Sequence, residues 1–179
     1  MSVFLLSQVI AAIAFALGVI SFQFKSRRSI LLWISGSAIA NACHFFVLDR
    51  PAAATLFLIT GGRSLAAAFT VNRKIMYLFF GLILAGFLFS YQAPLGFLGL
   101  FATLLATYGS FQNTHQKVRV IFMLSATSWM VHNILVRTPV AALMEAMFLA
   151  SNLVGYWRFH RSDKAVPDQG QDLTEKRPG

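Results

Sequence analysis

Three stretches of the sequence, residues 2–24, 75–91 and 93–114, contain no aspartate, glutamate, lysine or arginine. A helix of about 20 apolar residues spans the hydrocarbon core of a bilayer. Only 12% of all residues are charged, which is about half the share found in soluble domains, and the mean hydropathy is +0.66. The sequence therefore predicts an all-α polytopic membrane protein that is surrounded by the lipid bilayer.

The apolar runs and the turn residues between them predict seven transmembrane helices, at 3–24, 29–48, 52–71, 75–91, 95–113, 118–136 and 139–159. Pro51, Pro94 and Pro139 stand at the starts of helices, where a missing N–H costs little. We group the helices into a first three-helix bundle (1–74), a linker helix (75–91) and a second three-helix bundle (92–160). The polar segment 161–179 is predicted to be a disordered tail.

The chain is strongly basic, with a formal net charge of +9. Its lysines and arginines form short clusters between the apolar runs, which is typical of a topology signal and not of a nucleic-acid surface. Twelve of them lie in the odd-numbered connections and the tail, against only Arg50 and Arg137 in the even-numbered connections. Because positive residues gather on the cytoplasmic side, we expect the N-terminus outside and the C-terminus in the cytoplasm.

An internal repeat supports the division into two bundles. The tripeptide Ser-Phe-Gln at 21–23 recurs 89 residues later at 110–112, and His44 and Pro51 recur 88 residues later as His132 and Pro139. A single linker helix between two three-helix units makes them parallel, related by an axis along the membrane normal. We therefore expect two parallel three-helix bundles joined by a linker helix.

Two segments resemble the YgjV-type family of bacterial inner membrane proteins: HFFVLDRPAAATLFLITGGRSLAAAF and WMVHNILVRTPVAALMEAMFLASNLVGYWRF. The resemblance covers roughly residues 5–160 and rests on His44, Pro51, Arg63, His132, Asn133, Glu145, Asn152 and Trp157-Arg158. It implies a multi-pass protein of the bacterial inner membrane. The family is uncharacterised, so the resemblance implies no activity.

More distantly, the three-one-three plan is similar to that of SWEET sugar transporters and PQ-loop proteins, in which a solute binds between two three-helix bundles. This resemblance implies that Asn152, in the third helix of the second bundle, lines a solute pocket. The corresponding place in the first bundle falls near Arg63. Phe-Gln pairs at 22–23 and 111–112 replace the Pro-Gln pairs of those families.

Three polar residues lie deep in predicted membrane helices. At the helical rise, Arg63 lies about 18 Å, Glu145 about 9 Å and Asn152 about 20 Å below the outer ends of their helices. A charged side chain in hydrocarbon is costly, so each needs a partner or a polar cavity within the protein. Two hypotheses remain open: the three residues line a central cavity between the bundles, or Arg63 and Glu145 form a fixed structural pair.

His44 and His132 occupy equivalent positions in the repeat, and Asn133 follows the second of them. They are candidates for a solute-binding site or a facing pair, but no carboxylate or cysteine stands beside them at the spacing of a metal site. Buried polar groups are generally hydrogen-bonded, which favours bonds from both histidines to backbone carbonyls. Small residues at spacing four, Gly62/Ala66/Thr70 and Ala142/Ala146/Ala150, indicate close helix packing.

The sequence contains no catalytic motif, Glu145 is the only acid within a predicted membrane helix, and Cys43 is the only cysteine. We therefore expect no enzyme, no cofactor and no metal site. The favoured function is transport of a small polar or anionic solute of unknown identity, by one chain or by a homo-oligomer. The alternative is a non-transporting membrane scaffold or accessory subunit whose polar residues only hold helices together.

Overall fold

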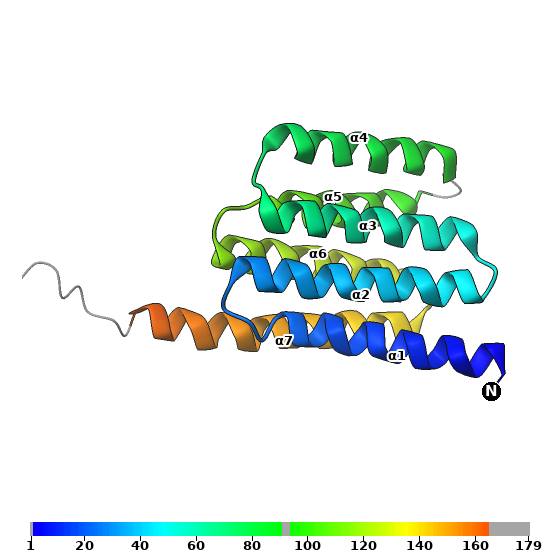
Figure 1. Cartoon of the computed structure of the whole chain (residues 1–179), viewed down its shortest axis with the longest axis horizontal. Helices are drawn as coiled ribbons and strands as arrows, with labels where there is room; N and C mark the ends of the chain where they lie inside the picture. The colour runs from blue at the N-terminus through cyan, green and yellow to red at the C-terminus, as the bar shows by residue number, and fades with distance from the viewer. Residues whose placement is uncertain (1, 91–93, 165–179) are drawn as a thin grey trace, which may run out of the picture.

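A computed structural model of the chain describes residues 2–90 and 94–164. Within these two ranges the fold is all-α, as predicted, and neighbouring helices alternate in direction (Figure 1). The seven helices are α1 (Val3–Ser21), α2 (Arg27–Val47), α3 (Pro51–Phe69), α4 (Arg73–Ser90), α5 (Gly96–Ser110), α6 (His115–Leu135) and α7 (Pro139–Lys164).

Several of these helices are long and apolar enough to cross a membrane. α1, α2, α6 and the Pro139–Phe159 part of α7 meet both criteria, and Ala53–Phe69 and Gly96–Ser110 are shorter apolar helices. Large apolar side chains lie on the outside, with Phe46 74% and Phe89 94% exposed. Such a surface is favourable in contact with lipid and unfavourable in contact with water. The number of seven spans and the orientation of the termini stay predictions.

The helices pack as two groups of three. α2 packs against both α1 and α3, and α6 packs against both α5 and α7. We call α1–α3 the first bundle and α5–α7 the second bundle. The bundles meet through α1 with α7 and through α3 with α5, while α4 packs mainly on α5. α1 and α5 run in the same direction (Figure 1), as expected for parallel bundles.

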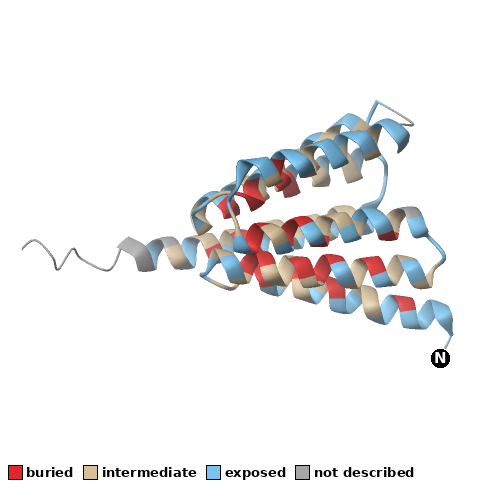
Figure 2. Cartoon of the chain, turned by 45° about the horizontal axis from the view of Figure 1, so that its top comes forward, coloured by how far each residue is buried: buried red, intermediate tan, exposed pale blue. Residues whose placement is uncertain are grey.

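The two ends of the molecule differ in composition. At the end that we call the basic end, α1, α3 and α5 finish, and α2, α4 and α6 begin with first turns that contain lysine or arginine. At the opposite end, the proline end, α3 begins at Pro51 and α7 at Pro139. Buried residues gather towards the basic end (left in Figure 2). They form two apolar clusters: Leu31, Ala67, Ala68, Met76 and Phe111 in one, and Phe22, Ile30 and Val118 in the other.

Helix boundaries at the basic end differ from the prediction. α1 ends at Ser21 and α5 at Ser110, each three residues earlier than predicted, whereas α2 and α6 begin earlier than predicted, at Arg27 and His115. The early starts have a local cause, because the hydroxyls of Ser26 and Thr114 accept hydrogen bonds from the third residue of each helix. Basic residues predicted to lie in the connections therefore begin helices.

The linker helix and the tail also begin and end elsewhere. α4 begins at Arg73 and not at residue 75, because Asn72 Oδ1 accepts a hydrogen bond of 2.8 Å from the Lys74 N–H. α7 continues to Lys164, so the first four residues of the predicted tail are helical. Residues 165–179 of that tail, and residues 91–93 at the predicted boundary between linker and second bundle, lie outside the described residues.

Matching contacts recur in the two bundles, which supports the internal repeat. Ser37 donates a hydrogen bond of 2.7 Å to the carbonyl of Ala14, and Ser125 donates one of 2.8 Å to that of Ala102. Both donors and both acceptors are 88 residues apart. The second residue after each second helix also repeats, since Asp49 has φ 54° and Arg137 φ 60°. The repeat therefore extends to helix-helix contacts and to helix ends.

Candidate functional site

Two adjoining cavities lie between the bundles. The inner cavity has a volume of about 210 Å³ and the outer cavity about 710 Å³. The outer cavity is bordered by α4 as well and reaches Leu95 and Val136 at the proline end. Residues of α3, α5, α6 and α7 line both cavities: Phe57, Thr60, Arg63, Ala106, Trp129 and Glu145. Both predicted membrane charges therefore stand where the two cavities meet.

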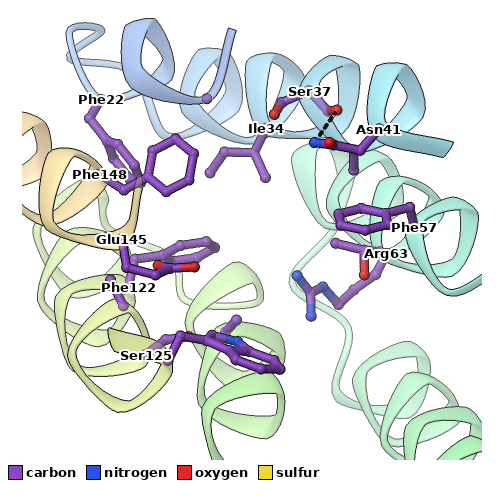
Figure 3. A pocket seen from close by; sticks show the side chains of 16 residues that line it. Phe22, Ile34, Ser37, Asn41, Phe57, Arg63, Phe122, Ser125, Glu145 and Phe148 are labelled. Carbon is purple, nitrogen blue, oxygen red and sulfur yellow. Dashed lines mark hydrogen bonds between the residues drawn. The ribbon is translucent and has the colours of Figure 1, made fainter. Parts of the chain in front are cut away.

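Arg63 reaches this place from α3 and is almost completely buried, with 3% of its surface exposed. Its Nη1 donates a hydrogen bond of 2.9 Å to Thr107 Oγ1, whereas its Nε is buried and has no partner. In Figure 3 the guanidinium points into the inner cavity. Because a guanidinium has five N–H donors, most of the hydrogen-bonding capacity of Arg63 is left for a ligand or water.

Glu145 approaches from the opposite side, on α7. Its carboxylate points into the cavity towards the side that holds Arg63 (Figure 3). Within the described residues, no hydrogen bond or ion pair joins Glu145 to any other group, and none joins it to Arg63. The fixed Arg63–Glu145 pair that the sequence left open is therefore not formed. The two charges face each other across open space.

The walls around the two charges are mostly apolar. Three polar wall residues of the inner cavity, Ser37, Ser125 and Asn41, each donate to a backbone carbonyl, at 2.7, 2.8 and 3.1 Å. Aromatic rings supply much of the remaining surface of the inner cavity: Phe22, Phe57, Phe122, Trp129 and Phe148. A site with apolar walls and few convergent polar groups is typical of small-molecule binding.

Asn152 does not belong to this site. It is 1% exposed and lines neither cavity, although the sequence placed it there. Its Nδ2 donates to the backbone carbonyl of Arg119 at 2.8 Å, and its Oδ1 accepts from Arg119 Nη1 at 3.4 Å. Asn152 therefore connects α7 to α6 at the basic end. The structure therefore places Asn152 outside both cavities, and a solute-binding role for it stays a prediction.

The two histidines bond backbone carbonyls, as expected. His44 Nδ1 lies 2.8 Å from the Ser7 carbonyl and His132 Nδ1 3.1 Å from the Leu95 carbonyl. Both contacts span 37 residues, and the two carbonyls are themselves 88 residues apart. His132 and Asn133 line the outer cavity near the proline end, whereas His44 lines neither cavity.

Two arginines that the sequence assigned only to topology hold the basic end together. Arg119 of α6 donates to the carbonyls of Phe22 and Phe24 after α1, at 2.8 and 2.5 Å. Arg27 of α2 donates to the carbonyls of Ser110 and Gln112 at the end of α5, and to Ala67 and Thr70 at the end of α3. We call these two sets of bonds the arginine clasps.

The clasps cross between the bundles in both directions. Arg27 is the first residue of α2 and Arg119 lies in the second turn of α6, and each binds the chain at the end of the first helix of the opposite bundle. Arg119 binds the carbonyls of two residues that follow α1, and Arg27 binds those of Ser110, the last residue of α5, and of Gln112 after it. Carbonyls at and beyond a helix end have no partner within the helix, so the arginines satisfy them. The sequence holds no direct signal for such contacts, since every residue offers a carbonyl. The only indication was a basic residue at the start of each second helix.

These observations define an all-α integral membrane protein with a charged cavity between two three-helix bundles. A family model described as "Bacterial inner membrane protein" (Imp-YgjV) matches residues 5–163, and the chain therefore belongs to the YgjV family of bacterial inner membrane proteins. It is similar to the inner membrane protein YgjV of Escherichia coli (strain K12), with 24% identity over 164 residues that cover 92% of this chain and 90% of that protein. No solved structure matches the chain.

Proposed function

We propose that the protein transports a small solute across the bacterial inner membrane, through a binding site between its two bundles. The observation that carries this proposal is the pair of unpaired charges, Arg63 and Glu145, that face each other across the cavities. Intramembrane charges are costly and usually mark a pathway. A purely structural pair would be in contact, because contact offsets the cost of burying each charge.

The two ends of the molecule support an alternating-access mechanism. At the basic end, apolar clusters and the arginine clasps close the space between the bundles. At the proline end, the outer cavity extends to the start of α5 and the end of α6. The site is therefore reached from one side, and release on the other side requires the clasps to open while the proline end closes.

We further propose that the basic end faces the cytoplasm, because twelve of the fourteen basic residues counted above lie in the α1–α2 connection, in the first two turns of α2, α4 and α6, or in the last turns of α7 and after it. In this orientation the cavities open towards the outside. Fusion of a reporter that is active only in the cytoplasm to the C-terminus is expected to give a signal. An active fusion of a reporter that requires export would contradict the orientation.

The experiment that tests transport is solute uptake into proteoliposomes. A panel of amino acids, sugars, carboxylates and amines is offered to vesicles with the unsubstituted protein, with Arg63→Gln, with Glu145→Gln and with the matched control Arg137→Gln. Arg137 is exposed and lines neither cavity. We expect flux of at least one solute with the unsubstituted protein and the control, and at least a tenfold loss with each cavity variant. No flux of any solute would favour the scaffold or accessory subunit.

A further inference from the structure

We propose that the solute is a small zwitterion, with one carboxylate and one ammonium group, of the α-amino-acid type. The proposal rests on the function proposed above and adds the chemical class of the ligand. It follows from three features of the cavities: two opposite charges that do not touch, the absence of other charged groups among the described lining residues, and walls that are largely apolar.

The Arg63 side of the site suits a carboxylate. Its guanidinium makes one hydrogen bond, to Thr107, and its buried Nε has no partner. A guanidinium is planar and binds a carboxylate through two parallel hydrogen bonds. An anionic group beside the guanidinium would offset part of the cost of burying its charge.

The Glu145 side suits an ammonium group. Its carboxylate has no hydrogen-bond donor within the described part of the chain, and an ionised carboxylate accepts several N–H donors. An ammonium offers three such donors and an opposite charge. The Glu145 side is therefore chemically complementary to the amine end of a solute.

Ligands with a single charge fit this site less well than a zwitterion. A simple carboxylate bound to Arg63 leaves Glu145 without a partner and adds a second negative charge to the cavity. A simple amine bound to Glu145 leaves Arg63 unpaired in the same way. At low dielectric these effects are strong, so the site discriminates against both. A neutral sugar satisfies neither charge.

The inner cavity has room for a small molecule. Its volume of about 210 Å³ corresponds to about seven water molecules, each of which occupies about 30 Å³ in the liquid. Between the two charges the walls are formed by Phe57, Phe122, Trp129 and Phe148. Such walls accept an apolar side chain and offer few additional hydrogen bonds, so the two charged ends fix the orientation of the solute.

The experiment measures binding and not flux, by thermal stabilisation of the purified protein in detergent. The twenty common amino acids are screened, and each that stabilises is compared with its deaminated acid and its decarboxylated amine: alanine with propionate and ethylamine, phenylalanine with 3-phenylpropionate and phenethylamine. We expect at least one amino acid to bind, with affinity at least tenfold higher than that of its acid or amine.

Two cavity variants show which residue recognises which charge. Glu145→Gln is expected to lose the preference for the amino acid over its acid, and Arg63→Gln the preference over its amine. If the substituted residue had only a structural role, its substitution would weaken the binding of all three ligands of a set equally. Because a glutamine variant can fail to fold, Arg63→Lys serves as a second variant that keeps the positive charge and is expected to retain the selectivity of the unsubstituted protein with reduced affinity.

The outcomes separate this inference from the proposed function. If an amino acid binds selectively but is not taken up into vesicles, the zwitterion site is supported and the transport proposal is contradicted. Uptake of a sugar or a simple anion, with no stabilisation by any amino acid, would retain transport and overturn the zwitterion site. Binding of an acid or amine as tight as that of its amino acid also overturns the inference.

Discussion

The third helices of the two bundles carry different residues in the middle of the membrane. Where the first bundle has Arg63, the second has Ser151, and where the second has Glu145, the first has Phe57. At their ends the bundles match, since His44 and His132 bond equivalent carbonyls and the residues that follow α2 and α6 share a positive φ. The repeat is thus kept at the helix ends and broken in the central cavity.

This difference separates two sets of residues. The repeated contacts form the framework that holds the helices together, and the two central charges form the site. Contacts that occur in both bundles satisfy backbone groups or end helices, as every helical bundle requires. The two central charges occur once each, on opposite bundles, and neither has an ionic partner. A site with two different ends for an asymmetric solute requires this loss of symmetry. The variants below are compared in pairs, and the free energy of unfolding shows whether a change affects the helix packing or the cavity site.

The largest effect is expected from the two buried arginines, which differ in role. Arg119→Met removes charged hydrogen bonds to two carbonyls and to Asn152, so the free energy of unfolding should fall by about 3 kcal/mol. Arg63→Met removes a buried charge with one hydrogen bond and should change it by less than about 1 kcal/mol. Thermal unfolding in one detergent measures both, and equal losses would contradict the division into clasp and site.

The next effect concerns Gly155, which stands 88 residues after Ala67. A Cβ at Gly155 would overlap the Phe22 carbonyl oxygen and the Arg119 guanidinium. Arg119 lies one helical turn further along its helix than Arg27 does, so its guanidinium is found beside Gly155. Gly155→Ala should therefore lower the free energy of unfolding by about 1–3 kcal/mol. In the control Gly62→Ala, the added Cβ meets no atom within 4 Å, and the variant should be as stable as the original or more stable. A stable Gly155→Ala protein would mean that α7 does not approach α1 so closely.

A smaller effect is expected from the paired histidines. His44→Phe and His132→Phe each remove one hydrogen bond to a carbonyl and should each lower the free energy of unfolding by about 1 kcal/mol. The two losses are expected to agree within about 0.5 kcal/mol, given the spread of such measurements. Chemical or thermal unfolding checks the agreement. A loss in only one variant would show that the two repeated hydrogen bonds do not contribute equally to stability.

The smallest effect is a gain in stability at the ends of α2 and α6. Asp49 and Arg137 have φ of 54° and 60°, a conformation that glycine adopts without the steric cost of a Cβ. Asp49→Gly and Arg137→Gly should each raise the free energy of unfolding by about 0.5–1 kcal/mol. Val136→Gly is the control, because Val136 has φ −84° and should gain nothing. A loss in either loop variant would indicate that its side chain makes a stabilising contact.

The sequence predicted the fold class because its causes are local. Uncharged apolar runs require helices in lipid. The start of α7 at Pro139 was predicted as observed, and the start of α3 at Pro51 was predicted one residue later. Repeat positions could be found in the same way, since a helix end or a histidine bond needs the same residue types in each bundle. The deep charges Arg63 and Glu145 were identified because an ionisable residue in an apolar helix is exceptional.

The rotation of each helix about its axis was decided only by tertiary packing. The sequence pattern assigned Gly62 to a packed stripe, yet a Cβ at Gly62 meets open space, while one at the neighbouring Gly61 meets Ile39 at 3.1 Å. One residue along a helix corresponds to a rotation of about 100°. An error of one residue in the assigned face therefore places a side chain on the outside of the molecule instead of against a neighbouring helix. Periodicity is weak evidence for the face when apolar residues surround the helix.

The sequence by itself determined that this chain is a helical membrane protein with two similar halves and two deep charges. Only the tertiary structure decided which polar groups meet: Asn152 binds Arg119 and not the cavity, the arginine clasps bind carbonyls of the opposite bundle, and Arg63 and Glu145 remain apart. The physical reason is that the acceptors of the clasps are backbone carbonyls, which every residue carries. Which carbonyl lies within reach of a given side chain depends on the distance and rotation of packed helices, and these follow from the whole assembly.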